Sequence, residues 1–203
     1  MLAVRDLAIG RSGWPILKDI SFTVAPGEAL ILSGPNGVGK TTLLRTLAGL
    51  QPPLGGRIEL DESTVAYASH ADGVKPTLTV RENLAFWAQI HGATLSDATL
   101  ARFDLMWLAD RMAGHLSAGQ KRRVGLARLD VIGRKVLLLD EPTVSLDRDR
   151  VALFARWLRG SHLREGGCAV IATHIDIGLD APVLDLTGKI VAAPEPDDEE
   201  AFL

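Results

Sequence analysis

Residues 34–42 have the residue types and the spacing that a phosphate-binding loop requires. They match the pattern G-x-x-x-x-G-K-[ST] and read Gly34, Pro35, Asn36, Gly37, Val38, Gly39, Lys40, Thr41 and Thr42. In such a loop, phosphate oxygens are held by backbone N–H groups that glycine leaves unobstructed and by the positive end of the following helix. We therefore expect this loop to bind ATP, with Lys40 on the β- and γ-phosphates and the Thr41 hydroxyl on Mg²⁺.

The flanking residues supply the strand and the helix that this loop needs. The apolar run Ala29–Leu32 precedes the loop, and Thr41–Ala48 is helix-like, with Gly49 placed to end that helix. The alternative is a glycine-rich turn that binds nothing. The strand–loop–helix context favours a nucleotide site, because that context is what makes the motif specific.

Two carboxylates form a second group that can do chemistry. The continuous apolar run Val136–Leu139 indicates a strand covered on both faces, and it ends in Asp140 and Glu141. Strand ends in open parallel sheets face the ligand crevice. We expect Asp140 to hold Mg²⁺ beside Thr41, and Glu141 to orient or deprotonate the attacking water. The alternative is an exposed acidic turn, which the upstream phosphate loop disfavours.

The segment at 116–123 links the chain to a family. It reads Leu-Ser-Ala-Gly-Gln-Lys-Arg-Arg, in which Ser117 is a good N-cap and Gly119 leaves room for a phosphate near the backbone. The segment resembles the signature sequence of ABC-transporter ATPases, usually Leu-Ser-Gly-Gly-Gln. The resemblance implies that two subunits pair head to tail, and that each contacts the partner's ATP through Ser117, Ala118, Gly119 and Gln120.

The resemblance covers about residues 2–192 and implies two further roles. Ser145-Leu146-Asp147 is similar to the loop that crosses the dimer interface, so Asp147 would also contact the partner's ATP. His174 follows the apolar run at 169–172, where the family places a histidine that senses the γ-phosphate and stabilises the developing charge.

Two positions depart from the family pattern. Where the family usually has a glutamine that bridges Mg²⁺ and the membrane subunit, this chain has His70. The family's adenine-stacking aromatic residue falls, by offset, at Arg11, with Trp14 nearby. Arg11 would stack through its guanidinium plane, or Trp14 would do so if the loop shifts. The sequence leaves both alternatives open.

The first part of the chain is β in character. The alternation of Ile20, Phe22 and Val24 predicts a strand with one buried face, and two short strands follow around 57–60 and 64–69. We expect these strands to form an antiparallel β layer beside the nucleotide-binding core.

From about residue 74 to residue 128 the pattern is helical. Thr79 and Glu82 have the spacing of a capping box. We expect Ser96 to cap a second helix, whose apolar stripe would be Leu100, Phe103 and Trp107.

We predict an α/β fold: a P-loop NTPase with a RecA-like core, an antiparallel β layer and an inserted helical subdomain, of the ABC ATPase type. Residues 1–203 would form a single nucleotide-binding domain. Residues 1–73 and 129–203 would form the core with its β layer, and residues 74–128 the helical subdomain, which ends in the signature helix.

Composition narrows the class of protein. The chain has 203 residues, of which 47% are hydrophobic and 23% are charged, as in a globular domain. A net charge of −3 gives no electrostatic reason to expect a nucleic-acid partner. There is no apolar run of about 18 residues, and the early charges Arg5 and Asp6 argue against a signal peptide. The single Cys168 excludes an internal disulfide and is expected in the core, and the acidic stretch 195–200 is expected to fray.

A narrower resemblance points to the cytochrome c maturation ATPases, the haem exporter subunits of this family. It is carried by His70, Gly73-x-Lys75-x-x-Leu78-Thr79, Glu82-Asn83-Leu84-x-Phe86 and residues 116–120. It implies ATP hydrolysis coupled to haem export or to release of a haem-loaded chaperone. It also implies a homodimer, integral membrane subunits of the CcmB and CcmC kind, and a peripheral place on the cytoplasmic face of the inner membrane.

Three alternatives stay open at this point. The chain resembles, in a broader sense, the ATPase subunits of other small exporters of drugs or lipids. A soluble ABC ATPase acting on ribosomes or DNA usually has two cassettes or basic surfaces, whereas this chain has one cassette and a slight acidic balance. A P-loop kinase would have no need for the segment at 116–120.

Overall fold

The computed structural model describes residues 1–11, 13–69 and 71–191 of the chain. The acidic stretch 195–200 lies outside the described residues. The strands are β1 (Leu2–Arg11), β2 (Trp14–Val24), β3 (Ala29–Ser33), β4 (Gly55–Glu59), β5 (Val65–Ala68), β6 (Val136–Asp140), β7 (Cys168–Ala172) and β8 (Val183–Asp185). The α-helices are α1 (Lys40–Leu47), α2 (Val80–Ile90), α3 (Asp97–Arg102), α4 (Ala118–Ile132) and α5 (Arg148–Trp157). Short helical turns are η1 (Glu62–Thr64), η2 (Met106–Leu108), η3 (Ala113–His115), the π-helix η4 (Leu158–Leu163) and η5 (Thr187–Lys189).

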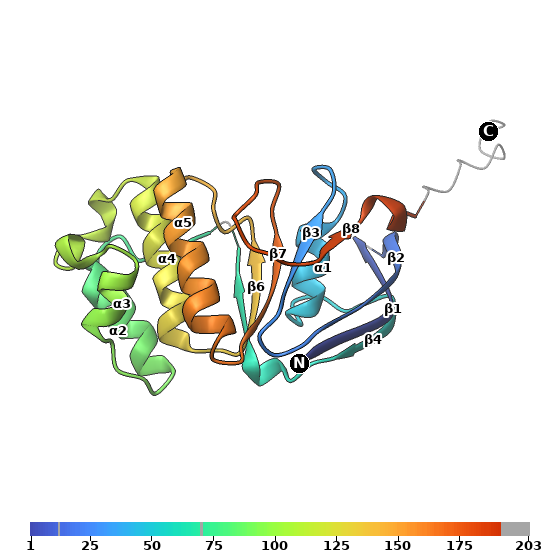
Figure 1. The fold of residues 1–203 in the computed structure, drawn as a ribbon, viewed down its shortest axis with the longest axis horizontal. Coiled ribbons are helices and arrows are strands. Elements are labelled where there is room, and N and C mark those ends of the chain that lie inside the picture. Colours follow the sequence, from blue (N-terminus) through green and yellow to red (C-terminus); the bar gives the residue numbers. More distant parts are fainter. Residues whose placement is uncertain (12, 70, 192–203) are drawn as a thin grey trace, which may run out of the picture.

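Two sheets organise the molecule. A five-stranded parallel sheet has the order β5-β6-β7-β3-β8, and a three-stranded antiparallel sheet has the order β2-β1-β4. Figure 1 shows α1 with the antiparallel sheet on one side of the parallel sheet, and α2 to α5 on the other. This arrangement confirms the predicted P-loop NTPase fold with an antiparallel β layer.

The strand predicted around 64–69 lies in a different sheet from the one we expected. β5 pairs in parallel with β6, with Val65 opposite Val136, so it is an edge of the central sheet and not part of the antiparallel layer. The 3-10 turn η1 separates it from β4, and the Asp61 side chain caps that turn by accepting from the Ser63 N–H. The chain is thereby redirected from the antiparallel sheet to the parallel one.

The parallel sheet is buried on both faces, as the apolar run at 136–139 predicted. Leu137 and Leu139 belong to the core shared with α2 to α5, whereas Val136 and Leu138 belong to the core shared with α1 and the antiparallel sheet. Each fully buried side chain of this size contributes roughly 1.5–3 kcal/mol relative to an exposed one. Cys168 is a free, buried thiol in β7, as expected.

The helical stretch begins with the capping box expected from the sequence. Thr79 Oγ1 accepts from the Glu82 N–H (3.1 Å), and the Glu82 carboxylate accepts from the Thr79 N–H (2.8 Å). Ser96 caps α3 by accepting from the Ala98 N–H at 3.1 Å. Among the helices that the structure describes, none combines the length and the apolar composition needed to cross a bilayer.

The apolar stripe expected on the second helix is wrong at one position. Leu100 and Phe103 are buried, but the Trp107 side chain is 62% exposed. The reason is that α3 ends at Arg102 and the chain then turns through Asp104, whose φ is +52°. Trp107 consequently lies in the separate turn η2, out of helical register with the other two residues.

Candidate active site

The loop between β3 and α1 has the backbone conformation that its glycines predict. The φ angles of Gly34, Gly37 and Gly39 are +135°, +83° and +117°, in the region that residues with a Cβ rarely adopt. Gly39 is the N-cap of α1, and in the described structure no side chain caps that helix end. The first N–H groups of α1 are therefore directed to the loop, where an anion can accept from them.

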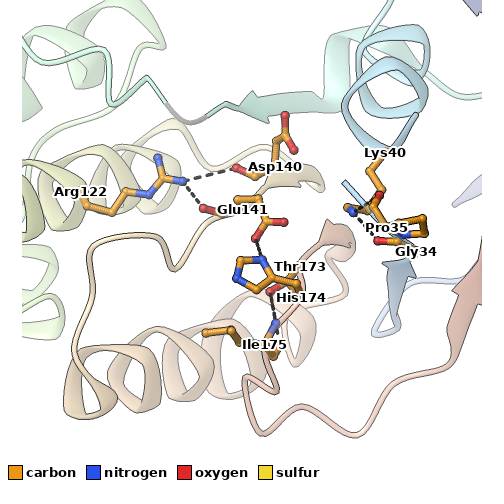
Figure 2. A network of polar contacts seen from close by, with 9 residues as sticks. All are labelled: Gly34, Pro35, Lys40, Arg122, Asp140, Glu141, Thr173, His174 and Ile175. Carbon is orange, nitrogen blue, oxygen red and sulfur yellow. Dashed lines mark hydrogen bonds and ion pairs between the residues drawn. The ribbon is translucent and has the colours of Figure 1, made fainter. Parts of the chain in front are cut away.

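Lys40 is held across this loop by the loop's own carbonyl groups. Its Nζ donates to the carbonyl oxygen of Gly34 at 2.6 Å and to that of Pro35 at 3.2 Å, and the residue is only 8% exposed (Figure 2). A buried ammonium group of this kind is a preformed partner for phosphate oxygens that enter the loop.

One cleft of about 390 Å³ brings together residues of the phosphate loop and both carboxylates that the sequence singled out. It lies between the loop at 34–42, the start of α1 and the end of β6. It is lined by Arg11, Ile16, Asn36, Gly37, Gly39, Lys40, Thr41, Thr42, Asp140 and Glu141. The fold thus brings the phosphate loop and the two carboxylates, about 100 residues apart in the chain, to one place.

Asp140 is buried, and a tyrosine that the sequence analysis missed contacts it. Tyr67 in β5 donates its hydroxyl to Oδ2 of Asp140 at 3.3 Å. Burial, and next the charge of Asp140, raise the pKa of Tyr67 to about 12, so the phenol stays a neutral donor at physiological pH. This contact follows from the parallel pairing of β5 with β6, which places Tyr67 opposite Leu138, two residues before Asp140.

The donor set at this point suits a hard cation. The Thr41 hydroxyl and the Asp140 carboxylate line the same cleft, and Mg²⁺ prefers oxygen ligands and keeps several waters or phosphate oxygens. Within the described residues, three or more His, Cys, Asp or Glu side chains do not converge on any point. His70, the third residue expected near the metal, lies outside the described residues.

Glu141 and His174 lie in contact at the ends of neighbouring strands. Nδ1 of His174 is 3.0 Å from Oε2 of Glu141 (Figure 2), and the two side chains are 63% and 22% exposed respectively. Glu141 has a φ of +49°, an unusual backbone conformation for a residue with a side chain. With Nδ1 engaged by the carboxylate, Nε2 is the ring nitrogen left for a phosphate.

A second missed residue, Arg122 of α4, contacts the same strand end from within the protein. It is 4% exposed, and its guanidinium donates to the backbone carbonyl groups of Asp140 and Glu141. The sequence carried a signal for it, because Arg122 falls on the same helical face as the buried residues Leu126 and Leu129.

The signature segment forms the N-cap that the sequence predicts. Ser117 Oγ accepts from the Gln120 N–H at 3.3 Å, and Gln120 Oε1 accepts from the Ser117 N–H at 2.9 Å. Among the described residues that line the cleft, none comes from 117–120. In one chain, therefore, the signature end of α4 and the phosphate loop do not form a common pocket.

The loop at 145–147 packs against the signature segment of the same chain. A Cβ atom on Gly119 would lie 2.6 Å from the carbonyl oxygen of Ser145, which is too close for any larger residue. Asp147 caps α5 by accepting from the Arg150 N–H at 2.9 Å. The two segments expected to face a partner's ATP are thus held next to each other.

Arg11 and Trp14, the two residues considered for stacking on the nucleotide base, differ in their position relative to the cleft. Arg11, at the end of β1, lines the cleft together with Ile16. Trp14 is its β2 partner in the antiparallel pair, but it is 65% exposed and does not belong to the described lining of the cleft. Of the two residues, Arg11 is therefore the one that lines the cleft.

Comparison with known proteins agrees with this geometry. The sequence model of the family described as "ABC transporter" matches residues 17–144. A protein of Ruegeria pomeroyi named "Cytochrome c biogenesis ATP-binding export protein CcmA" is 64% identical over 198 residues, which are 98% of this chain and 96% of that protein. The protein of the same name from Rhodobacter capsulatus is 58% identical over 196 residues, which are 96% of this chain and 91% of that protein.

A solved structure shows the same fold. It is that of cbiO1 from Clostridium perfringens, described as part of the ABC transporter complex cbiONQ. It superimposes with a TM-score of 0.78 at 28% sequence identity, and the match covers 94% of this chain and 86% of that one. From its sequence, its fold and the residues of its cleft, this chain belongs to the ABC transporter family of ATP-binding proteins, and within that family it groups with the CcmA proteins.

Proposed function

We propose that the chain is the ATP-hydrolysing subunit of a membrane transport complex for cytochrome c biogenesis. Its turnover would drive haem export or the release of a haem-loaded chaperone. ATPase chemistry follows from the family to which the chain belongs. The observation that carries the proposal is the cleft that joins the phosphate loop with Asp140 and Glu141, with His174 in contact with Glu141. The names of relatives that are 54–64% identical support the link to cytochrome c.

Nucleotide binding begins at the phosphate loop. The backbone N–H groups of the loop at 34–42, except at Pro35, which has none, and the Lys40 ammonium bind the β- and γ-phosphates, and Arg11, which lines the cleft, would lie beside the base. Thr41 and Asp140 would hold Mg²⁺, with His70 as a further ligand, directly or through water. When bound, Mg²⁺ supplies charge neutralisation for the phosphate oxygens.

Hydrolysis then uses the two strand ends. Glu141 orients a water molecule towards the γ-phosphorus and accepts its proton as the new P–O bond forms and the bond to ADP breaks. His174 contacts Glu141 through Nδ1; in the imidazolium form, in which both ring nitrogens are donors, it would also donate from Nε2 to the γ-phosphate and stabilise the developing charge. The products are ADP and inorganic phosphate.

Two copies are needed to complete each site. They pair head to tail, so that each ATP lies between one copy's phosphate loop and the other copy's Ser117, Ala118, Gly119, Gln120 and Asp147. The composition of the cleft supports this arrangement, because none of the described residues that line it comes from 117–120 of the same chain. Hydrolysis removes the group that holds the copies together. Residues 74–128 act as a helical subdomain and transmit the opening to CcmB- and CcmC-like membrane subunits, at the cytoplasmic face of the inner membrane.

The shared site is tested by mixing two inactive variants. Lys40→Ala removes a phosphate ligand, and Ser117→Asp keeps a helix-capping side chain but places a negative charge towards the partner's phosphate. Each variant alone should lose turnover, and the mixture should regain part of it, because half of the sites in a mixed pair are intact. Ser117→Thr is the control, because threonine also caps a helix and, like serine, carries no charge. The idea of a shared site is refuted if Ser117→Asp alone hydrolyses ATP normally.

Two assays separate this function from its alternatives. Phosphate release from ATP without any added acceptor distinguishes an ATPase from a P-loop kinase. Co-expression with the CcmB- and CcmC-like membrane subunits, followed by measurement of haem on the periplasmic chaperone, tests the cargo. Haem release that proceeds unchanged with the Glu141→Gln variant would exclude coupling to this chain.

A further inference from the structure

Arg122 is the side chain that ties the signature helix α4 to the carboxylate end of β6. Its Nη2 donates to the carbonyl oxygens of Glu141 (2.6 Å) and Asp140 (3.4 Å), and its Nε donates to that of Pro142 (2.9 Å). These three acceptors are consecutive, so one planar guanidinium follows the backbone through the turn that carries both carboxylates. Figure 2 shows the bonds to Asp140 and Glu141.

The residue at the centre of this turn needs such support. Glu141 has a φ of +49°, and backbone conformations of this kind persist only where the surrounding contacts fix them. Its N–H donates to the Ala172 carbonyl of β7, and its carbonyl accepts the shortest of the Arg122 hydrogen bonds. The direction of the Glu141 side chain therefore depends on a bond made by α4.

The same guanidinium also binds the residues that follow β5. Nη1 donates to the Ser69 carbonyl at 2.9 Å and to Oδ1 of Asp72 at 3.1 Å. Asp72 lies close along α4, because a Cβ on Gly125 would come within 3.0 Å of its carbonyl oxygen. Arg122 thus joins three elements: the residues that follow β5, the turn that follows β6, and α4.

The neighbouring Arg123 shows that a buried arginine on this helix does not necessarily contact the residues of the cleft. Arg123 is 5% exposed, and its Nη1 donates to the carbonyls of Phe103 and Asp104 and to the Asp104 carboxylate. None of these described acceptors lines the cleft. The two arginines are adjacent and comparably buried, and each donates to backbone carbonyls and to one aspartate, but of the two only Arg122 contacts the carboxylate turn.

We propose that Arg122 is a positioning residue for ATP hydrolysis: it holds the Glu141 backbone in the conformation that turns the carboxylate to the cleft, and it makes that hold depend on Ser69 and Asp72. A movement of the residues after β5 would then alter the orientation of Glu141 without any contact to the nucleotide. This role rests on the proposed function of Glu141 as the residue that activates water.

Kinetics of the full chain test the proposal against a structural role. Arg122→Gln should lower kcat by about 10- to 100-fold, since a catalytic group displaced by about 1 Å loses on that order of rate. The Kd for ATP should stay within about twofold, because Arg122 does not touch the phosphate loop. Arg122→Lys should not restore kcat, because one ammonium cannot reach acceptors both at 140–142 and at Ser69 and Asp72.

Arg123→Gln is the matched control. It removes an equally buried guanidinium from the same helix, so its urea midpoint should fall to a similar extent while kcat is largely kept. If the two variants lose equal stability and equal kcat, Arg122 has only a structural role and the proposal is overturned.

A double-mutant cycle with Glu141→Gln shows whether Arg122 acts through Glu141. In the Glu141→Gln background, Arg122→Gln should change the residual single-turnover rate little, whereas a full additional loss would overturn the positioning role. The Glu141→Gln arm alone reports on the proposed function: normal turnover there refutes Glu141 as the base, irrespective of Arg122.

Asp72→Asn keeps the proposal testable if the Arg122 variants do not fold. It removes only the charge that pairs with Nη1. It should lower kcat less than Arg122→Gln does and leave the Kd for ATP unchanged. An unchanged kcat in Asp72→Asn would overturn the dependence on the residues after β5.

Discussion

The imidazole of His174 and the carboxylate of Glu141 are joined by a contact of 3.0 Å between Nδ1 and Oε2. The two residues lie 33 positions apart in the chain and follow adjacent strands, β7 and β6, in which Ala172 lies opposite Asp140. Register in the parallel sheet, and not proximity in sequence, therefore decides that these two side chains meet.

Replacing Glu141 by Gln should stop the chemical step and spare nucleotide binding. A general base contributes typically about 10²- to 10⁴-fold to a rate, so ATP turnover should fall by about 100-fold or more. The amide keeps the volume of the side chain but cannot accept the proton of water. Phosphate release and ATP titration measure the two effects, and size-exclusion chromatography with ATP should show more of the closed pair. Near-normal turnover would rule out the assigned role.

Replacing Lys40 by Ala should weaken ATP binding. Hydrogen bonds to charged groups are worth about 1.5–3 kcal/mol, so the Kd should rise by about 10- to 100-fold. Calorimetric titration with ATP measures the change. Lys135→Ala is a suitable control, because Lys135 donates to the Glu165 carbonyl and precedes β6, at the end of that strand opposite to the cleft. Equal affinity in the two variants would contradict the phosphate-loop assignment.

Replacing Tyr67 by Phe should raise the Mg²⁺ concentration needed for half-maximal ATPase activity. The ring stays in place, but Asp140 loses the hydroxyl that donates to its Oδ2. Residues that orient metal ligands typically affect metal affinity or activity by about 10- to 100-fold when removed, and the 3.3 Å length of this bond places the expected effect at the lower end. Binding of ATP without Mg²⁺ serves as the internal control. An unaltered Mg²⁺ dependence would show that the contact does not orient Asp140.

Ionisation of the Tyr67 phenol should not change the Mg²⁺ dependence of ATPase activity near neutral pH. Its pKa of about 12 keeps it protonated throughout the range in which the enzyme is assayed. Parent and Tyr67→Phe chains should therefore show Mg²⁺ profiles that shift in parallel between about pH 7 and about pH 9. Divergence of the two profiles with pH would mean that the hydroxyl ionises there.

His162 should make the protein less stable in mild acid. Burial lowers its pKa below the usual 6.5, although the hydrogen-bond contact of Nε2 with the Cys168 carbonyl (3.2 Å) opposes the shift. Between the folded pKa and 6.5, the unfolded chain binds more protons at this site, so the free energy of unfolding falls as the pH drops through 6.5. Urea unfolding at about pH 7.5 and about pH 5.5 measures the loss. His162→Gln should lose less stability over this interval, and an equal loss would exclude His162 as the source.

Much of the framework of the site could be predicted from local sequence. The capping box at Thr79, the N-cap at Ser117 and the buried strand at 136–139 were expected from short patterns, and the structure confirms them. Such features depend on residues within one turn or one strand, so a single segment contains the whole signal. The catalytic and binding roles assigned to these residues stay predictions.

What could not be predicted depends on pairings between distant segments. Whether β5 joined the antiparallel layer or the central sheet depended on the path of the chain after Asp61, and the Tyr67 contact with Asp140 follows from that choice. Arg122 looks like an ordinary helix cation until its hydrogen-bond partners after β5 and after β6 are known. Trp107 left the predicted stripe because its helix ended early.

The close fit between Gly119 and the Ser145 carbonyl has a consequence for any engineering of this surface. The two segments expected to face a partner, 117–120 and 145–147, are not independent of each other, because Gly119 and Ser145 are in close contact within one chain. A larger residue at position 119 would displace the segment 145–147 of the same chain. This displacement would add to any effect on binding of the partner's ATP. Loss of activity in such a variant would therefore have two sources, and only substitutions that keep position 119 small can separate them.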